Sequence, residues 1–290
     1  MFQIPGHDIG DGWIYVDDAT NTAHLFCLFA PENQGQLWSI GHASSCDLKN
    51  WDFHGAVLTP GSPGDWDDYR LATGSVLRHN GRYFMAYTGH ARSNVPPCGR
   101  VGMAVSDDLF HWKKCRDFPV IELDRSRFES VITGTRPALH WRDPFLLEEN
   151  GKFHLFLCAR NKDGDVKTRG TAAHFVSDDL FHWTLGEDVR HELFAEELEV
   201  PQIYHIGGRY CFLFCTHENL LKEPQEGGNF VMTSDSLLGP YSDPRRLEAR
   251  GPGYWYAAQF FRFRGQWYQF ATSNLGTKTF FADPYPLSLD

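Results

Sequence analysis

Long apolar runs are missing from this sequence of 290 residues, although 42% of its side chains are apolar and 15% are aromatic. No stretch approaches the ~20 consecutive apolar residues that a membrane-spanning helix needs. The opening, MFQIPGHDIGDGW, also lacks the basic end and apolar middle of a signal peptide. We therefore expect a globular protein of the cytoplasm with no membrane partner and with a core large enough for one folded unit.

Positive charge is also scarce, since 27 Lys and Arg residues face 37 Asp and Glu residues and the net charge is −10. Proteins that bind nucleic acids neutralise phosphates with basic patches. The balance therefore argues against a nucleic-acid partner and favours a small neutral ligand.

The usual signatures of metal, disulfide and phosphate sites are absent too. The seven cysteines are odd in number and form no CxxC pair, and the fourteen histidines show no HxH or HExxH spacing. No glycine-rich phosphate loop occurs. We expect buried free thiols, packed or polar histidines, no metal and no cofactor.

Helical periodicity is missing as well, and a repeat takes its place. Short apolar runs, such as GRYFMAYTG and GKFHLFLCAR, recur at nearly even intervals after a glycine or a turn. Their first residues are Asn21, Gly81, Gly151, Gly208 and Gly265. Alternating apolar and small or polar residues with Gly or Asn-Gly turns are typical of antiparallel hairpins.

A second signature follows the first in most units. SSCDLKNW ends at Trp51, SDDLFHW ends at Trp112 and again at Trp183, and a degraded TSDSLLGPY ends at Tyr241. Each unit thus reads as strand, turn, strand, loop, strand and a polar turn that packs an aromatic ring. Five such units predict an all-β, five-bladed β-propeller that spans residues 1–290 as a single domain. A β-sandwich or a β-helix fits the repeat less well.

In a propeller, the strand before each glycine-led run is the innermost one, and its first residues stand at the mouth of the central channel. Asp11, Asp143 and Glu199 occupy this position in three units, while Thr73 and Ala257 occupy it in the other two. One acid at a strand start is commonly a solvated turn residue. Three acids that converge on one axis would repel each other and raise at least one pKa.

Several carboxylates beside aromatic rings suit the cleavage of a glycosidic bond, in which one acid protonates the leaving oxygen and another attacks carbon or activates water. Tryptophans stack on sugar faces, although packing between blades is their commoner role. The candidates for stacking are Trp13, Trp38, Trp66, Trp141 and Trp255.

The segments GHASSCDLKNW, TGSVLRHNGRYFMAYTG, WRDP, ELEVPQIY and YWYAAQFF resemble the consecutive blade motifs of glycoside hydrolase families 32, 43, 62 and 68, the five-bladed furanosidase-type propellers. The order of these motifs matches along nearly the whole chain. The sequence is most similar to family 32, the β-fructofuranosidases, whose Arg-Asp-Pro and Glu-Cys-Pro motifs correspond to residues 142–144 and 199–201.

This resemblance implies roles for individual residues. Asp11 would be the nucleophile, Asp143 the stabiliser of the transition state and Glu199 the acid/base, while Arg142 would contact the sugar. Ser75, His42 and Tyr256 would lie at the rim of the subsite for the terminal sugar unit. Of the tryptophans that could stack on a sugar, Trp13, Trp38 and Trp255 are the ones we expect to bind the substrate.

The sequence also departs from the family 32 pattern. Family 32 opens with Asn-Asp-Pro-Asn-Gly, whereas this chain reads HDIGDGWIY, so Asp8 competes with Asp11. Val200 and Gln202 replace the usual Cys and Asp, which puts fructose specificity in question. Only ADPYPLSLD follows Phe281, so no C-terminal β-sandwich is expected.

Two other functions therefore stay open. A single-domain propeller is more typical of family 43, whose members are inverting arabinofuranosidases, arabinanases and xylosidases. A carbohydrate-binding propeller without catalysis is the alternative from another class. Finally, GSPGDWDDYRLATGS at residues 61–75 has the composition of a mobile loop that either shapes the substrate entrance or only connects two blades.

Overall fold

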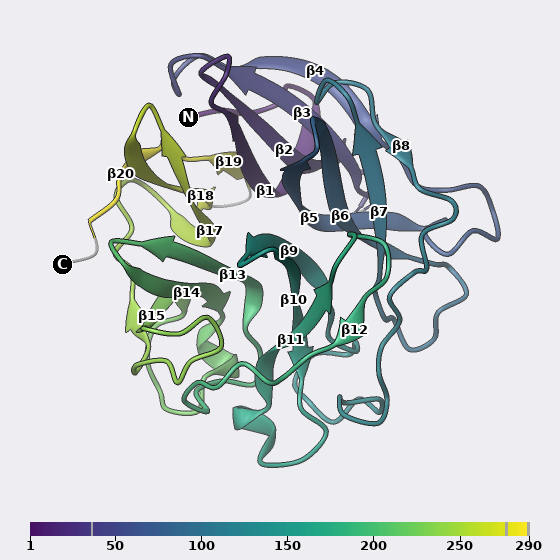
Figure 1. Cartoon of the computed structure of the whole chain (residues 1–290), viewed down its shortest axis with the longest axis vertical. Helices are drawn as coiled ribbons and strands as arrows, with labels where there is room; N and C mark the ends of the chain where they lie inside the picture. The colour runs from purple at the N-terminus through teal and green to yellow at the C-terminus, as the bar shows by residue number, and fades with distance from the viewer. Residues whose placement is uncertain (36, 276–277, 289–290) are drawn as a thin grey trace.

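The computed structural model describes residues 1–35, 37–275 and 278–288, which form five antiparallel sheets arranged in a ring (Figure 1). The first two sheets contain β1 (His7–Asp17), β2 (Thr22–Pro31), β3 (Ser39–Ser45) and β4 (Asp52–Leu58), then β5 (Arg70–His79), β6 (Arg82–His90), β7 (Arg100–Ser106) and β8 (Lys113–Lys114). The third contains β9 (Trp141–Glu149), β10 (Lys152–Arg160), β11 (Gly170–Ser177) and β12 (Thr184–Leu185).

The fourth sheet contains β13 (Glu199–Ile206), β14 (Arg209–Thr216), β15 (Gly228–Ser234) and β16 (Arg245–Arg246). The fifth contains β17 (Tyr254–Phe263), β18 (Gln266–Leu275), β19 (Lys278–Phe281) and β20 (Tyr285–Pro286). Two short 3₁₀ turns, η1 (Val166–Thr168) and η2 (Glu218–Leu220), interrupt the loops. Within the described part of the chain, no helix has the length and apolar character to cross a membrane.

The strand order confirms the five-bladed propeller that the repeat predicted. The first four sheets are built in chain order from the first strand outward, and in the fifth both β19 and β20 pair with β18. Neighbouring sheets contact each other largely through their first strands. Figure 1 shows β1, β5, β9, β13 and β17 around the central axis. As expected, each glycine-led run forms the second strand of its blade.

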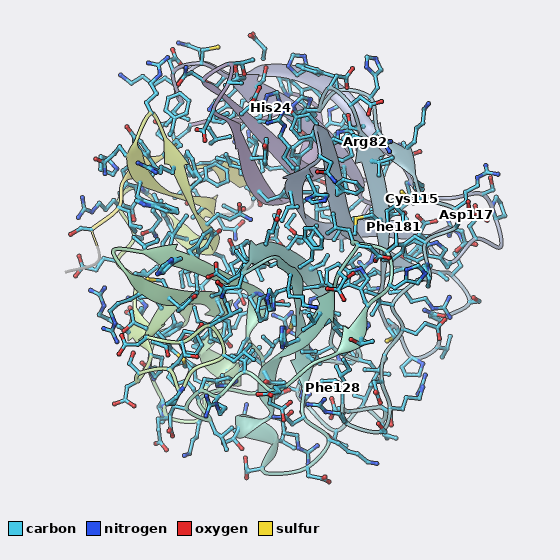
Figure 2. The ribbon with its side chains drawn as sticks, viewed as in Figure 1. His24, Arg82, Cys115, Asp117, Phe128 and Phe181 are labelled. Atoms are coloured by element: carbon cyan, nitrogen blue, oxygen red, sulfur yellow. The ribbon has the colours of Figure 1, made fainter. Side chains whose placement is uncertain are left out.

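Apolar side chains fill the spaces between neighbouring blades. Each of the five larger apolar clusters joins two neighbouring sheets, so every blade covers its neighbours. Phe181, for example, extends from the third blade to within 6.2 Å of the ring of Phe84 in the second (Figure 2). The start of the chain closes the ring, because Phe2 and Phe281 exchange two backbone hydrogen bonds of 3.0 Å.

The repeated SDDLFHW segment forms the polar turn at the outer end of a blade. In the second blade, the Ser106 hydroxyl accepts the N–H of Leu109 at 2.9 Å, and Asp108 accepts two further backbone N–H groups. Leu109 takes a left-handed conformation with φ of 69°, which turns the chain so that the indole of Trp112 donates to the Leu109 carbonyl at 2.8 Å. The turn therefore fixes the aromatic ring on the blade, as the sequence predicted.

A β-bulge interrupts the innermost strand of every blade. In each blade the bulge lies at or next to the residue that the sequence placed at the channel mouth. Asp11 lies in the bulge of β1 between Ile9 and Gly12, and Thr73 lies in that of β5. Asp143 lies in the bulge of β9 with φ of 59°. Bulges turn side chains away from the regular alternation of a strand, which is how these residues point toward the channel.

The register corrects one detail of the repeat. Val200 and Ala257, both with φ of 49°, are the equivalents of Asp143 in the fourth and fifth blades. Glu199 stands one residue earlier, at the position that Arg142 occupies in the third blade. The acids therefore do not share a single repeat position, because the bulges offset the count from the glycine turns.

Candidate active site

Three carboxylates from different blades meet at one end of the central channel. The Thr73 hydroxyl donates to Asp11 Oδ2 at 3.1 Å and so joins the second blade to the first. Asp143 Oδ2 accepts the backbone N–H of Val200 at 3.2 Å, which places it next to Glu199. Each acid lies close enough to change the ionisation of another. The structure thus brings together the three acids that the sequence selected.

Asp11 carries the most strongly raised pKa of the three. Burial raises the pKa of its carboxyl to about 7, and the negative charges of Asp143 and Glu199 act in the same direction. The Thr73 hydroxyl and the Arg142 guanidinium act against the shift but are too weak to reverse it. Repulsion by the other two acids, which the sequence led us to expect, thus contributes to the raised pKa, but burial is the larger cause.

Asp143 is 4% exposed, and its left-handed backbone aims its side chain into the cluster. Burial raises the pKa of its carboxyl, and the neighbouring Glu199 adds to this effect, whereas Arg142 opposes it. The Arg142 Nε atom lies 3.4 Å from Asp143 Oδ2. The side chain is therefore a buried acceptor paired with one cation.

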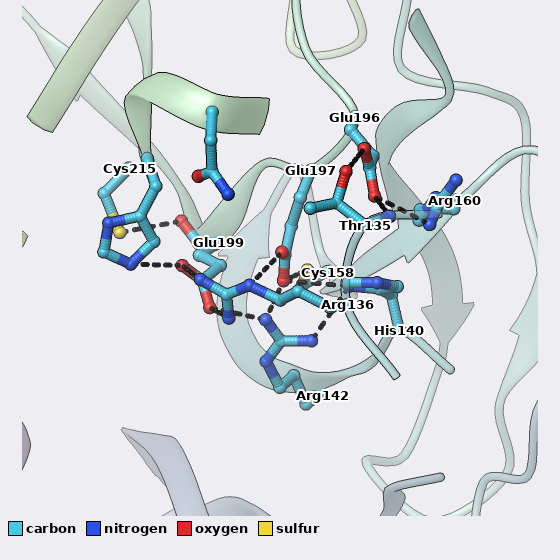
Figure 3. A network of polar contacts seen from close by, with 12 residues as sticks. Thr135, Arg136, His140, Arg142, Cys158, Arg160, Glu196, Glu197, Glu199 and Cys215 are labelled. Atoms are coloured by element: carbon cyan, nitrogen blue, oxygen red, sulfur yellow. Dashed lines mark hydrogen bonds and ion pairs between the residues drawn. The ribbon is translucent and has the colours of Figure 1, made fainter. Parts of the chain in front are cut away.

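Glu199 is held by two arginines (Figure 3). Arg136 donates to Oε1 at 2.8 Å and to Oε2 at 3.2 Å, and Arg142 donates to Oε1 at 2.5 Å. The Tyr256 hydroxyl also donates to Oε2. Burial acts to raise the pKa of Glu199, but the arginines outweigh burial and lower it to about 2.

The two pKa values determine where the proton of this pair resides. Between about pH 2 and pH 7, Asp11 and Glu199 together hold one proton, and it sits on Asp11. A retaining glycosidase needs one proton on the same kind of pair, on the acid/base rather than on the nucleophile. The single proton on this pair fits the chemistry of a retaining glycosidase. However, the ligand-free protein holds the proton on Asp11, whereas the reaction needs it on Glu199.

Arg136 comes from the long connection between β8 and β9, and its position is fixed by its neighbour. Thr135 donates to Glu196 through its backbone N–H at 2.6 Å and its hydroxyl at 2.8 Å. Glu196 is fully buried and pairs with Arg160 at 3.2 Å. Figure 3 shows this network beside the two arginines that donate hydrogen bonds to Glu199.

Glu197 forms a second buried layer beneath Glu199. Its Oε1 contacts Arg142 and lies 2.9 Å from His140 Nδ1, and its Oε2 lies 3.3 Å from Arg136. His140, Cys158 and Glu197 have ligand atoms within 4.8 Å of one another, as a metal site requires. However, two guanidinium groups already supply positive charge to Glu197, so the geometry fits an ion-pair network better than a cation site.

Aromatic rings form the opposite wall of the site. The ring of His217 stacks on Tyr256 with centroids 4.3 Å apart, and its Nε2 lies 4.0 Å from Glu199 Oε2. Tyr254 continues the stack at 5.8 Å from Tyr256. Tyr256 therefore lies where the sequence placed it, at the rim of the site.

The register decides between the two candidates for the first carboxylate. Asp8 is exposed and lies before the bulge of β1, paired with Ala30. Asp11 lies inside the bulge and contacts Thr73. Asp11 is therefore the member of the cluster.

His42 is not at the site, contrary to the sequence-based prediction. It lies on β3, two strands out from the channel, and is fully buried. Its Nε2 is 2.9 Å from Nδ1 of His24, which Figure 2 labels in the first blade. Phe26 and Phe110 pack on its ring with centroids 4.8 and 4.9 Å away. The histidine of the GHASS motif therefore packs within the blade and does not reach the acid cluster.

Four further residues predicted to bind sugar also serve packing. Trp13 is 1% exposed and stacks on Phe26, and Trp255 is 4% exposed and packs on Tyr285. The Ser75 hydroxyl accepts the N–H of Leu146 and so joins the second and third blades. Trp38 packs partly buried between the first and second blades. Among the described residues, no hydrogen bond or ion pair joins the side chains of these four to the acid cluster. Trp13, Ser75 and Trp255 lie on innermost strands with their side chains in blade interfaces, whereas Trp38 lies just before β3.

The segment 61–75 is also more ordered than its composition suggested. Asp67 is 2% exposed and accepts from Tyr87 at 3.1 Å and from Lys114 at 2.5 Å. From Arg70 onward the segment is strand β5.

Arg136, Glu196 and His217 are the residues of the site that the sequence did not reveal. No repeat or motif marks them, because all three lie in loops between strands. Thr73 was visible as the equivalent of the acids, and Glu197 was visible as a neighbouring acid. Loop residues of this kind are placed by the fold and leave no periodic signal.

Comparison with known proteins gives the family. The model of the glycosyl hydrolases family 32 N-terminal domain matches residues 11–275. A probable sucrose-6-phosphate hydrolase of Vibrio cholerae is 26% identical over 212 residues, which are 70% of this chain and 35% of that protein. A sucrose-6-phosphate hydrolase of Zymomonas mobilis is 27% identical over 250 residues, which are 81% of this chain and 45% of that protein. A raffinose invertase of Escherichia coli is 26% identical over 183 residues, or 60% and 34% of the two chains.

Solved structures agree on the fold. The structure of a sucrose-6-phosphate hydrolase from Lactobacillus gasseri matches with a TM-score of 0.77 at 20% identity, over 97% of this chain and 59% of that one. Bacillus subtilis levansucrase also matches with a TM-score of 0.77, at 13% identity over 99% and 85% of the two chains. The chain spans about a third to a half of the length of the curated relatives. Because the family match runs through all five blades, the chain belongs to the glycosyl hydrolases family 32, N-terminal domain.

Proposed function

We propose that this chain is a retaining glycoside hydrolase that cleaves a β-fructofuranosyl bond in a small sucrose-type sugar. The observation that carries the proposal is the cluster of Asp11, Asp143 and Glu199 at one channel mouth, in which the charge of Glu199 raises the pKa of both aspartates. The family match and the relatives named for sucrose-type sugars support this reading. Nothing in the proposed reaction requires a cofactor.

In the proposed reaction, the Asp11 carboxylate attacks the anomeric carbon and Glu199 gives its proton to the leaving oxygen. Water, activated by Glu199, then cleaves the covalent sugar ester and returns the proton. Asp143 accepts hydrogen bonds from sugar hydroxyls and stabilises the positive charge that develops on the ring. Arg142 orients Asp143 and Glu199 through the contacts described above.

The proton must move from Asp11 to Glu199 before this reaction begins. Arg136 is the group best placed to allow the move, since it donates two hydrogen bonds to Glu199 and its side chain is 33% exposed. If a sugar hydroxyl takes the place of this guanidinium, the pKa of Glu199 rises and that of Asp11 falls toward its usual value. The substrate itself would then set the protonation state that cleavage needs.

The stereochemistry of the product separates this proposal from the inverting reaction of family 43 enzymes. We expect the first-formed fructofuranose to keep the anomeric configuration of the substrate. Proton NMR, read before mutarotation, measures this directly. An inverted first product would make Asp11 a general base that activates water and would remove the covalent intermediate.

Replacement of Glu199 by glutamine tests the acid role. We expect kcat on a natural sucrose-type sugar to fall by about 10²–10⁴-fold, because an alkoxide is a poor leaving group without protonation. An aryl fructofuranoside, whose leaving group needs little protonation, should lose much less. Glu197→Gln serves as the matched control, because this fully buried acid contacts the same arginines but has no exposed edge for a substrate. Equal losses of E199Q on both substrates would contradict the acid role.

A carbohydrate-binding propeller without catalysis is the second candidate, and the low pKa of Glu199 favours it. A carboxylate held ionised by two arginines accepts sugar hydroxyls well and donates no proton. Sugar binding by calorimetry without any release of product would establish this reading. The cytoplasmic location that the sequence predicted stays a prediction.

A further inference from the structure

The innermost strand of the fifth blade carries Tyr256 immediately before its bulge, and side chains of the fourth blade hold this bulge in place. Tyr256 pairs with Thr272 on β18, and the regular register resumes only at Gln259. Ala257, inside the bulge, has a left-handed backbone with φ of 49°. Because this conformation is costly for a residue other than glycine, it persists only where surrounding contacts hold the chain.

Gln202 is the first of two buried amides that supply these contacts, and it is 1% exposed. Its Nε2 group donates to the Val200 carbonyl at 3.1 Å and to the Ala258 carbonyl at 2.9 Å. Its Oε1 atom accepts the hydroxyl of Tyr204, which in turn accepts the backbone N–H of Phe260 at 3.3 Å. One side chain therefore ties the bulge of β13 to the bulge of β17.

Asn229 is the second buried amide. It lies on β15, the third strand of the fourth blade, and is 3% exposed. Its Oδ1 atom accepts the backbone N–H of Ala258 at 2.9 Å, and its Nδ2 group donates to the Trp255 carbonyl at 3.2 Å. These two backbone groups stand on either side of Tyr256, so the side chain spans the bulge. Gln202 and Asn229 are called here the amide pair.

The amide pair determines where the hydroxyl of Tyr256 lies. This hydroxyl donates to Glu199 Oε2, and Glu199 directly precedes Val200, whose carbonyl accepts from Gln202. Both partners of the hydrogen bond therefore lie on backbone that the same amide holds. The family 32 pattern has Asp at the position of Gln202, and an ionised carboxylate has no N–H to donate to two carbonyls. The link between the two bulges is thus made by a residue in which this chain departs from the pattern.

The proposed reaction needs Glu199 first as an acid and then as a base. Arg142 donates to Oε1, so Oε2 is the oxygen that can carry the exchanged proton when the substrate displaces Arg136. A hydroxyl suits this oxygen, because it can donate to the carboxylate and accept from the protonated form, whereas a guanidinium can only donate. Tyr256 can therefore stay in contact with Oε2 in both states of Glu199.

We propose that Gln202 and Asn229 are positioning residues for the acid/base, which hold Tyr256 so that its hydroxyl stays on Glu199 Oε2 through both steps of the reaction. This inference rests on the proposed function. The amide pair acts through Tyr256 and contacts neither the substrate nor the reacting atoms. A role in stability alone would lower the melting temperature on loss of either amide and would leave the hydrogen bond to Glu199 in place.

NMR of the chain labelled with ¹³C at the Cζ atom of tyrosine measures this hydrogen bond without any catalysis. A phenol that donates to a carboxylate gains phenolate character, which moves its Cζ signal downfield, and Tyr256→Phe identifies the signal by removing it. We expect Gln202→Met, which removes both donors at similar volume, to move the Tyr256 signal upfield.

Asn229→Asp is the second variant. It keeps an acceptor for the N–H of Ala258 and removes only the donor to the Trp255 carbonyl, so it tests the inference even if Gln202→Met does not fold. We expect the Tyr256 signal to move upfield here as well. An unchanged Tyr256 signal in the folded variants would overturn the proposal.

Kinetics test whether the contact serves the acid/base. Loss of a hydrogen bond to a charged group typically costs a factor of ~10 or more. We expect Tyr256→Phe to lower kcat on a natural sucrose-type sugar about 10-fold, with little change in KM and a much smaller loss on an aryl fructofuranoside. Gln202→Met should cause a loss of the same kind, and little further loss in a chain that already carries Tyr256→Phe. Additive losses, or equal losses on both sugars, would overturn the proposal.

Ser75→Ala is the matched control. The Ser75 hydroxyl also joins the innermost strands of two neighbouring blades, since it accepts the N–H of Leu146 at 2.8 Å, and it is 6% exposed. We expect a lower melting temperature with an unchanged Tyr256 signal and unchanged kcat. A shift of the Tyr256 signal equal to that in Gln202→Met would show a general effect of weaker blade contacts and would overturn the proposal.

The two measurements separate this inference from the proposed function. If the Tyr256 signal moves as expected but the wild-type chain cleaves no fructofuranoside, the amide pair holds the contact and the proposed hydrolysis is wrong. If the chain cleaves its substrate and the signal does not move, the hydrolysis stands and the role of the amide pair is wrong.

Discussion

Replacement of Asp143 by asparagine is expected to lower kcat by about 10²–10³-fold while the melting temperature stays nearly unchanged. The loss of activity follows because an amide cannot supply the negative charge that steadies a developing oxocarbenium ion. The fold tolerates the change, since asparagine adopts the left-handed backbone of this position and keeps an oxygen that can accept the N–H of Val200. Burial already raises the pKa of Asp143, so its charge adds no stability to the folded state.

Asp179→Asn is the control, because it makes the same chemical change in a structural position. Asp179 accepts the backbone N–H groups of Phe181 and His182 at 2.9 and 2.8 Å in a turn of the third blade. The hydrogen bond with the side chain of His182 comes first among the causes that lower its pKa, so its charge stabilises the folded state. We expect a lower melting temperature with unchanged kcat. The same pattern in D143N would show that Asp143 only holds the strand start.

The sequence was sufficient for the fold because the repeat is local. A glycine turn between two short apolar runs fixes a hairpin, and five evenly spaced hairpins with polar end turns leave few architectures other than a propeller. Asp11 and Asp143 could be found for the same reason, since each lies a similar number of residues before the turn that follows the innermost strand of its blade.

The sequence was less informative where burial decides the role of a side chain. His42 lies within a motif that resembles the family, and Trp13 follows Asp11 closely in the sequence, yet both side chains are buried between or within blades. Arg136 had no signal at all, because it reaches Glu199 from an irregular connection anchored by Thr135 and Glu196.

Replacement of Asp11 by asparagine is expected to have the largest effect on turnover, a loss of about 10⁴-fold or more, because the amide cannot form the covalent intermediate. The wild-type pH profile should reflect the single proton of the Asp11–Glu199 pair. With a pKa of about 7 for Asp11 in the free protein, kcat/KM should fall above about pH 7, where this proton is lost. Thr73→Val removes a hydroxyl that lowers this pKa, so the fall should begin at higher pH.

The Asp11→Asn substitution should also stabilise the protein in a pH-dependent way. The unfolded chain releases the proton of Asp11 near pH 4, its ordinary pKa, whereas the folded chain keeps it until about pH 7. The folded wild-type protein therefore binds more protons in this window, and its stability decreases as the pH rises from about 4 to about 7. An amide side chain has no such proton to release, so D11N should gain melting temperature relative to the wild type across this window and hold a constant advantage above it. Scanning calorimetry at pH values below, within and above the window measures the difference. A difference that does not vary with pH would mean that Asp11 titrates normally, and the charge coupling that defines this site would then be wrong.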